Sequence, residues 1–103
     1  MLVVVTRNVP LRCRGFLASC LLEVAPGTYV SPKVNSAVRE RLWNTLNGWW
    51  EDNENSGLAM IWNDHTQSSG ISINVLGSPP NELVEYDGLF LRKKKYLKTD
   101  IIL

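Results

Sequence analysis

The chain has 103 residues, of which 45% are hydrophobic and 20% charged, a composition typical of one globular domain. No apolar run approaches the ~20 residues of a membrane-spanning helix, and the first residues, MLVVVT, lack the features of a secretory signal peptide. These patterns argue against a membrane protein and a secreted one, and we expect a cytoplasmic protein.

The net charge of +1 hides an uneven distribution along the chain. Residues 1–41 carry six bases and two acids (net +4), residues 42–91 carry seven acids and no base (net −7), and residues 92–103 carry five bases and one acid (net +4). If the two basic segments or two protomers converge, they form an anion-binding surface. An ordinary solvated surface is the alternative.

The apolar residues 1–6 predict a buried strand. A helix follows, with Asn8 as its cap and Pro10 in its first turn, and Pro26 and Gly27 end it. Its apolar stripe is Cys13, Leu17, Cys20, Leu21 and Val24.

The two cysteines, Cys13 and Cys20, stand about 10 Å apart along this predicted helix. A disulfide needs Cα atoms within ~7 Å, so we expect two reduced core residues. The sequence has no cluster of cysteine and histidine with zinc-ligand spacing.

Residues 28–31 predict a short strand, and a second helix begins at Ser31-Pro32 or at Asn35-Ser36. We expect Arg39 and Glu40 to point away from its buried face. That face holds Val38, Leu42, Thr45, Leu46 and Trp49.

Strands over 58–63 and 71–75, joined by the loop 64–70, predict a hairpin. An irregular connector over 77–81, a turn at 87–88 and a short strand over 89–91 follow. The last strand either pairs in its own sheet or reaches the edge of a second protomer's sheet.

This order of elements predicts an α+β protein, a ferredoxin-like two-layer sandwich with an antiparallel sheet and two helices on one face. An extra strand and tail follow at the C-terminal end. We expect a ferredoxin-like domain over 1–91 and a basic tail over 92–103.

Few residues suit catalysis. His65, the only histidine, falls in a polar loop, and the acids around 51–54 have the pattern of a solvated turn. Core packing or a subunit interface explains the four tryptophans better than base stacking does. Arg12 and Arg14 are the best local candidates, because a phosphate at the start of their helix would offset the repulsion between cations and the helix dipole.

Several spacings recur together along the chain. They are Leu2 to Pro10 (LVVVTRNVP), Arg12-x-Arg14-Gly15-x-Leu17, Leu21-Leu22-Glu23-Val24, Gly27-x-Tyr29-Val30, Arg39-Glu40-x-x-Trp43, Ala59-Met60-x-Trp62 and Asp87-Gly88-Leu89. This pattern, which covers nearly the whole chain, resembles the small CRISPR adaptation protein of the type I-E systems, the dimeric partner of the spacer integrase.

The resemblance implies a ferredoxin-like homodimer for spacer acquisition, which binds prespacer duplex DNA and bridges integrase dimers. Arg12, Arg14 and Arg39 match basic positions of that family, and we expect them and Asn8 to contact nucleic acid. The family's basic pair after the fourth strand is absent here, so DNA contacts must be redistributed. The residues expected to dock on the integrase are Leu89, Phe90, Leu91, Arg92, Lys93, Lys94 and Lys95.

Some members of that family are described as metal-dependent endonucleases with a carboxylate just after the first strand. Arg7 and Asn8 stand there in this chain, and an arginine cannot ligate Mg²⁺. We therefore expect neither catalysis nor a metal or other cofactor. The alternative is a metal-dependent endoribonuclease or endonuclease of the same family, which would need Mg²⁺.

Overall fold

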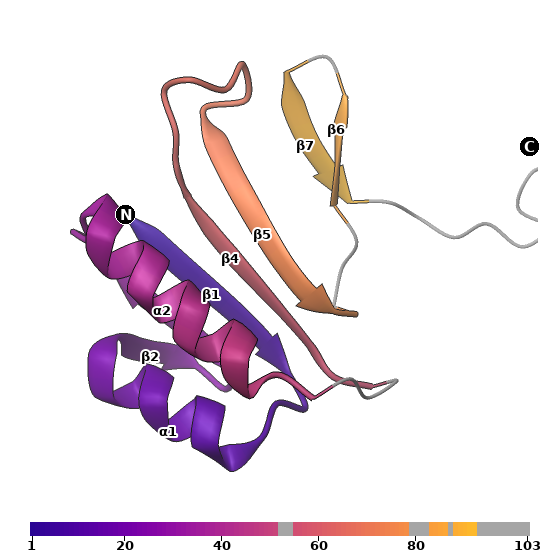
Figure 1. Cartoon of the computed structure of the whole chain (residues 1–103). Helices are drawn as coiled ribbons and strands as arrows, with labels where there is room; N and C mark the ends of the chain where they lie inside the picture. The colour runs from indigo at the N-terminus through magenta and orange to yellow at the C-terminus, as the bar shows by residue number, and fades with distance from the viewer. Residues whose placement is uncertain (52–54, 79–82, 87, 93–103) are drawn as a thin grey trace, which may run out of the picture.

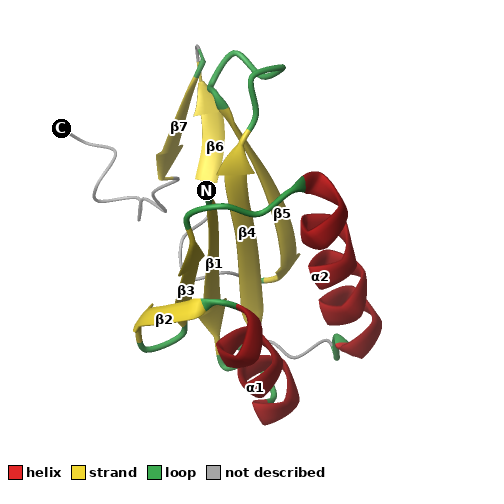
Figure 2. Ribbon diagram, turned by 90° about the vertical axis from the view of Figure 1, so that its left-hand side faces the viewer, coloured by secondary structure: helices red, strands yellow, loops and turns green. Residues whose placement is uncertain are grey.

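The computed structural model has an α+β architecture, in which two helices cover one face of an antiparallel sheet (Figure 2). The helices are α1 (Leu11–Cys20) and α2 (Ser36–Trp49). The structure describes residues 1–51, 55–78, 83–86 and 88–92. Within these ranges, no helix is long and apolar enough to cross a membrane.

The apolar first strand lies at the centre of the sheet. β1 (Leu2–Arg7) pairs with β3 (Thr28–Ser31) on one side and β4 (Gly57–Asn63) on the other, both antiparallel (Figure 1). β2 (Leu22–Ala25) lies beyond β3 and β5 (Ile71–Gly77) beyond β4, which gives the order β2-β3-β1-β4-β5. The first four strands and both helices have the ferredoxin-like connectivity, and β5 extends the sheet, so the predicted fold is confirmed.

The core lies between the sheet and the helices. Leu2 and Val4 of β1 pair with Trp62 and Met60 of β4, and alternate residues of a strand share a face. The helices contribute Cys13, Leu17, Leu42 and Leu46 to the same cluster, and all four are at most 4% exposed. This continuous apolar layer fixes both helices over the central strands.

The opposite face of the sheet, here called the open face, is also apolar. In each strand, the residues between the core positions point to this open face. The alternating isoleucines of β5 therefore face away from the helices. Val75 on this face is 48% exposed, whereas Ala59 beside it is 7% exposed. The open face includes Val3, Val5, Val30, Ile61, Ile73 and Val75.

The first helix is shorter than predicted. It ends at Cys20, and Leu22–Ala25 form β2, which pairs with β3 through Leu22 and Val30. Gly27 makes the intervening turn with φ +75°, where a Cβ would lie 2.8 Å from the Thr6 hydroxyl oxygen. Strand pairing therefore overrides the helical spacing of this segment, and Val24 is exposed rather than part of the stripe.

The predicted helix cap is also wrong. Pro10 occupies the cap position of α1 without a side-chain hydrogen bond, and Asn8 instead has φ +49°. Its side-chain amide donates to the Asn55 carbonyl at 3.0 Å. Asn8 thus forms a turn between β1 and α1, a role that asparagine supports because it tolerates positive φ.

The two cysteines are both free, as predicted, but they differ in burial. Cys13 is buried in the core, whereas Cys20 is exposed, so the prediction that both are core residues is wrong for Cys20. The buried residues of α1 are Cys13 and Leu17, one turn apart, whereas Cys20 is the last residue of the helix.

The second of the two predicted starts for α2 is correct. Asn35 caps the helix by accepting a hydrogen bond from the Val38 amide at 2.9 Å. Leu42 and Leu46 are buried as predicted, but Val38 is 38% exposed and lies outside the core. Arg39 was predicted to point away from the buried face, but it is half-buried and packs toward the sheet.

The last strand belongs to a hairpin of which only the turn and the second strand were predicted. β6 (Leu83–Tyr86), which was not predicted, pairs with β7 (Leu89–Arg92) in a separate two-stranded sheet. The hairpin lies on the side of the main sheet away from the helices (Figure 2). Within this chain, the late strand therefore pairs with β6 rather than with the main sheet.

Candidate nucleic-acid interface

Arg12, in the first turn of α1, is held by an aromatic ring of α2. Its guanidinium carbon lies 4.2 Å from the centroid of the Trp49 ring, within the range of a cation–π contact. Phe16, one turn further along α1, meets the same indole edge-on at 5.3 Å. Trp49 therefore fixes the orientation of Arg12 and also joins the two helices.

Arg14 lies on a different flank of α1, because two residues turn an α-helix by about 200°. Its side chain reaches the hydroxyl of the buried Tyr29, which also contacts Glu23. Burial raises the pKa of the Tyr29 phenol and Glu23 adds to the increase, while Arg14 opposes it. The structure therefore does not bring Arg12 and Arg14 together, and the carboxylate of Glu23 lies near Arg14.

Arg39 repeats the arrangement of Arg12 at the other end of α2. Its guanidinium carbon lies 4.4 Å from the centroid of Trp62, a half-buried residue of β4. Arg39 and Trp49 are ten positions apart on the same helix, so about 15 Å of helix axis separates the two arginine–indole pairs. Both pairs lie on the side of the sheet that the helices cover.

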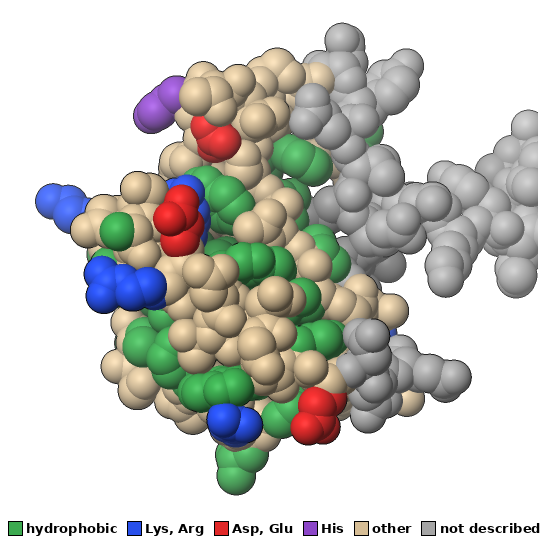
Figure 3. All heavy atoms as spheres, in the orientation of Figure 1, with side chains coloured by type: hydrophobic (Ala, Val, Ile, Leu, Met, Phe, Trp, Pro, Cys, Tyr) green, Lys and Arg blue, Asp and Glu red, His purple; other side chains and the backbone are tan. Residues whose placement is uncertain are grey.

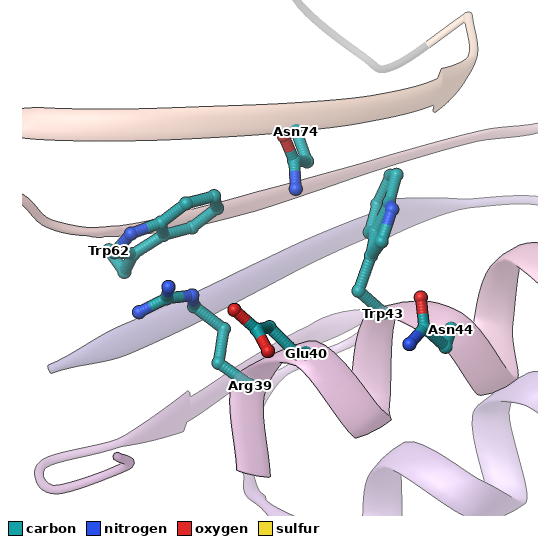
Figure 4. A pocket seen from close by; sticks show the side chains of 6 residues that line it. All are labelled: Arg39, Glu40, Trp43, Asn44, Trp62 and Asn74. Carbon is teal, nitrogen blue, oxygen red and sulfur yellow. The ribbon is translucent and has the colours of Figure 1, made fainter. Parts of the chain in front are cut away.

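A groove opens beside Arg39, between α2 and the strands β4 and β5 (Figure 4). Its volume is about 330 Å³. The six residues that line it are Arg39, Glu40, Trp43, Asn44, Trp62 and Asn74.

The turn after β1, where the resemblance places a catalytic carboxylate, is held by hydrogen bonds to its neighbours. Arg7 donates from Nε to the Asn55 carbonyl at 3.2 Å, and the Asn8 carbonyl accepts from the buried Ser56 hydroxyl at 2.7 Å. Asn8 therefore has a structural role here, in addition to any contact with nucleic acid. Among residues 1–51, 55–78, 83–86 and 88–92, no group of three His, Cys, Asp or Glu side chains could hold a metal ion.

Asp64 is the described acid with the most strongly lowered pKa, which is about 2. The main cause is a hydrogen bond from the Ser72 hydroxyl at 2.5 Å, and the Thr66 hydroxyl at 2.6 Å adds to it. Arg39 contributes a weaker electrostatic effect. These bonds close the loop between β4 and β5, so we interpret Asp64 as structural. His65, next to it, is exposed as predicted.

The basic side chains on the helix face do not gather in one patch. Figure 3 shows them at separate places along the margin of this face, with acidic side chains near some of them. A ligand that contacts several of them must therefore be extended rather than small.

Part of the predicted docking segment lies in β7. Leu89 is 64% and Leu91 47% exposed, while Phe90 is half-buried. Arg92 is the last residue of the strand. Lys93, Lys94 and Lys95 lie outside the described residues, as does the rest of the predicted tail.

Sequence analysis missed the role of two tryptophans. Trp49 and Trp62 pack against the core, as predicted, but they also support the guanidiniums of Arg12 and Arg39, which was not predicted. Trp50, next to Trp49, is also half-buried and packs against the core. The spacing offered one signal, because Arg39 is one helical turn from Trp43 and hence on the face that meets the sheet.

A family model described as "CRISPR-associated protein (Cas_Cas2CT1978)" matches residues 1–91. The match covers both helices and every main-sheet strand, and it ends within β7.

Proposed function

The chain belongs to the CRISPR-associated protein family Cas_Cas2CT1978, and we propose that it serves spacer acquisition, as in type I-E systems. In this proposal it is a homodimeric scaffold that binds prespacer duplex DNA and bridges integrase dimers without catalysis of its own. The partners are therefore duplex DNA, a second copy of the chain and the integrase.

The observation that carries the proposal is the pair of arginines stacked on indole rings. A guanidinium stacks through its flat face and donates hydrogen bonds in its plane, so stacking leaves its donors available. Among the described residues, the side chains of Arg12 and Arg39 donate no hydrogen bond, whereas Arg7 donates one to Asn55. The two guanidiniums lie near opposite ends of α2, and this separation suits the phosphates of an extended duplex better than a small anion.

The open face supports the homodimer. Monomeric proteins rarely expose large contiguous apolar patches, and this face carries half-buried valine and isoleucine from four adjacent strands, with Val75 exposed. Pairing two open faces would bury them and leave the helices of both protomers on the outside. The stacked arginines would then remain accessible to DNA in each protomer.

The alternative function is a metal-dependent nuclease of the same family. The turn after β1 argues against it, because Arg7 stands where the resemblance requires a carboxylate and Mg²⁺ prefers oxygen ligands. An assay with labelled RNA and DNA, in Mg²⁺ or Mn²⁺ and in EDTA, separates the two functions. Metal-dependent cleavage that disappears on mutation of a nearby acid would establish the nuclease.

The scaffold is tested by fluorescence anisotropy with labelled duplexes of unrelated sequence over a range of salt concentrations. If Arg12, Arg14 and Arg39 act in both protomers, six phosphates are neutralised and the slope of log K against log salt is about −5. Sedimentation measures the dimer in the same buffers, and co-purification with the integrase tests the bridge. Salt-insensitive binding would mean that phosphate contacts are not the basis of recognition.

A further inference from the structure

The groove beside Arg39 has walls of two kinds. Trp62 of β4 and Trp43 of α2 both project into it, and Asn74 of β5 lies above the space between them (Figure 4). Asn44 and Glu40 belong to the helical wall, with Glu40 between Arg39 and Trp43. The groove thus combines aromatic surfaces with amide and carboxylate groups.

This combination suits a planar, polar ring. An indole offers a face for stacking, and an asparagine amide both donates and accepts hydrogen bonds. The carboxylate of Glu40 accepts hydrogen bonds, as the exocyclic amino group of adenine or cytosine requires. A volume of about 330 Å³ is at the small end of ligand sites, which span roughly 300–1,000 Å³.

Arg39 adds a group for phosphate at the edge of the groove. Because its guanidinium is stacked on Trp62, its in-plane donors can face a phosphate while a base lies further in. Aromatic stacking of bases beside basic side chains is how proteins hold single-stranded nucleic acid.

We propose that this groove binds an unpaired nucleotide of the DNA, with its base stacked on Trp43 and its phosphate on Arg39. The inference rests on the proposed scaffold function, because it places an unpaired end of the same DNA beside the duplex surface. It adds a site for single-stranded ends that duplex binding does not require.

The test compares a blunt duplex with the same duplex carrying three unpaired adenosines at each end. Stacking of a base changes affinity by about 5- to 150-fold, so the unpaired ends should tighten binding by the full-length chain at least fivefold. Trp43→Leu should abolish this gain and leave the affinity for the blunt duplex unchanged.

Asn74→Ala provides a second variant, in case the loss of Trp43 disturbs packing, and it should reduce the same gain. Asn47→Ala, an exposed asparagine of α2 outside the groove, is the matched control and should keep the gain in full. A gain that survives in both groove variants would overturn the proposal. Thermal melting of each variant shows whether the fold is retained.

A second measurement tests the groove without a duplex. A short oligodeoxyadenylate, titrated into the isotopically labelled chain, should shift the nuclear magnetic resonance signals of the Trp43 and Trp62 indoles and the Asn74 amide. The Trp49 indole, outside the groove, should not move. If the blunt duplex does not bind, the scaffold function fails; if it binds but unpaired ends add nothing and these signals stay fixed, only the groove proposal fails.

Discussion

The guanidinium carbon of Arg12 lies 4.2 Å from the centroid of the Trp49 ring, so a charged side chain of α1 is anchored to the last residue of α2. The same indole packs against Phe16 of α1. The contact therefore links a candidate phosphate-binding group to the packing of the two helices.

Replacing Arg12 by lysine should separate charge from stacking. The lysine keeps the positive charge but loses the planar guanidinium, so we expect duplex affinity to fall several-fold while the salt slope stays the same. A lysine contacts the Trp49 ring less well than the planar guanidinium does, so urea unfolding should show a loss of at most about 0.5–1 kcal/mol. Arg41→Lys, an exposed arginine on α2, is the control and should leave both measurements unchanged. Equal effects of the two variants would show that stacking on Trp49 is irrelevant.

Tyr29 should make the protein sensitive to alkali. Burial, with Glu23 second, raises the pKa of its phenol above the ordinary 10.0, so the folded state favours the neutral form. The resulting stabilisation is fully present below about pH 10 and is lost as pH rises through the raised pKa. Urea unfolding of the wild type and Tyr29→Phe between pH 8 and 11.5 measures it, and only the wild type should show this loss.

Glu23→Gln should lower the pKa of Tyr29 without returning it to the ordinary value, because burial is the larger cause. The measurement is ultraviolet titration of the phenol, taken as the difference from the Tyr29→Phe background. A pKa that does not change would mean that Glu23 does not contact the phenol in solution.

Asp64 should make the loop between β4 and β5 sensitive to acid. Its pKa is lowered from 3.8 to about 2, first by the Ser72 hydroxyl and then by Thr66. The stabilisation is present above about pH 4 and is lost as pH falls through 2. The protection of the amides of residues 64–70 against exchange, relative to an unfolded chain at the same pH, should fall in that window, and Asp64→Asn should lack this protection throughout. Identical exchange in the two proteins at pH 5 would exclude this role.

Gly77 should tolerate no side chain. It has φ +62°, and a Cβ there would lie 2.6 Å from the Trp50 ring and clash with the Ser56 carbonyl. Gly77→Ala should destabilise the protein by about 1–3 kcal/mol in urea unfolding. Gly15→Ala is the opposite case, because a Cβ in mid-helix meets nothing within 4 Å, and it should stabilise by up to about 1 kcal/mol.

Truncation after Leu91 should separate partner binding from DNA binding. We expect loss of co-purification with the integrase, because the resemblance assigns docking to the C-terminal segment, while binding of the blunt duplex persists through Arg12 and Arg39. Loss of duplex binding instead would assign the basic residues beyond Leu91 to DNA.

The strands over β1, β4 and β5 could be predicted because each carries its own local signal, an apolar run or an alternation. The strand β2 could not, since Leu21 and Val24 have the spacing of the helix before it, whereas Leu22 and Val24 have that of a strand. Only pairing with β3, which lies beyond the turn at Gly27, decides between them. The strand β6 was missed for a similar reason, because what places it in a sheet is its pairing with β7, which follows it in the chain.

The candidate site shows the same limit. Arg12 and Arg39 could be predicted from charge and resemblance, but their places over Trp49 and Trp62 could not, because each indole comes from a distant part of the chain. Grouping Arg12 with Arg14 ignored the helical rotation between them. The groove could not be predicted at all, because Asn74 meets Trp43 only after the sheet has formed.

The central position of β1 has a consequence for biosynthesis. Leu2 pairs with Trp62, so β1 has no partner on that edge until β4 has also emerged from the ribosome. During this interval the valines of β1 are exposed and can pack against the wrong chain segments, as in other folds with many sequence-distant contacts. Slow elongation before Asn63 would therefore lengthen the exposure of β1, and a chaperone that covers the strand would shorten it.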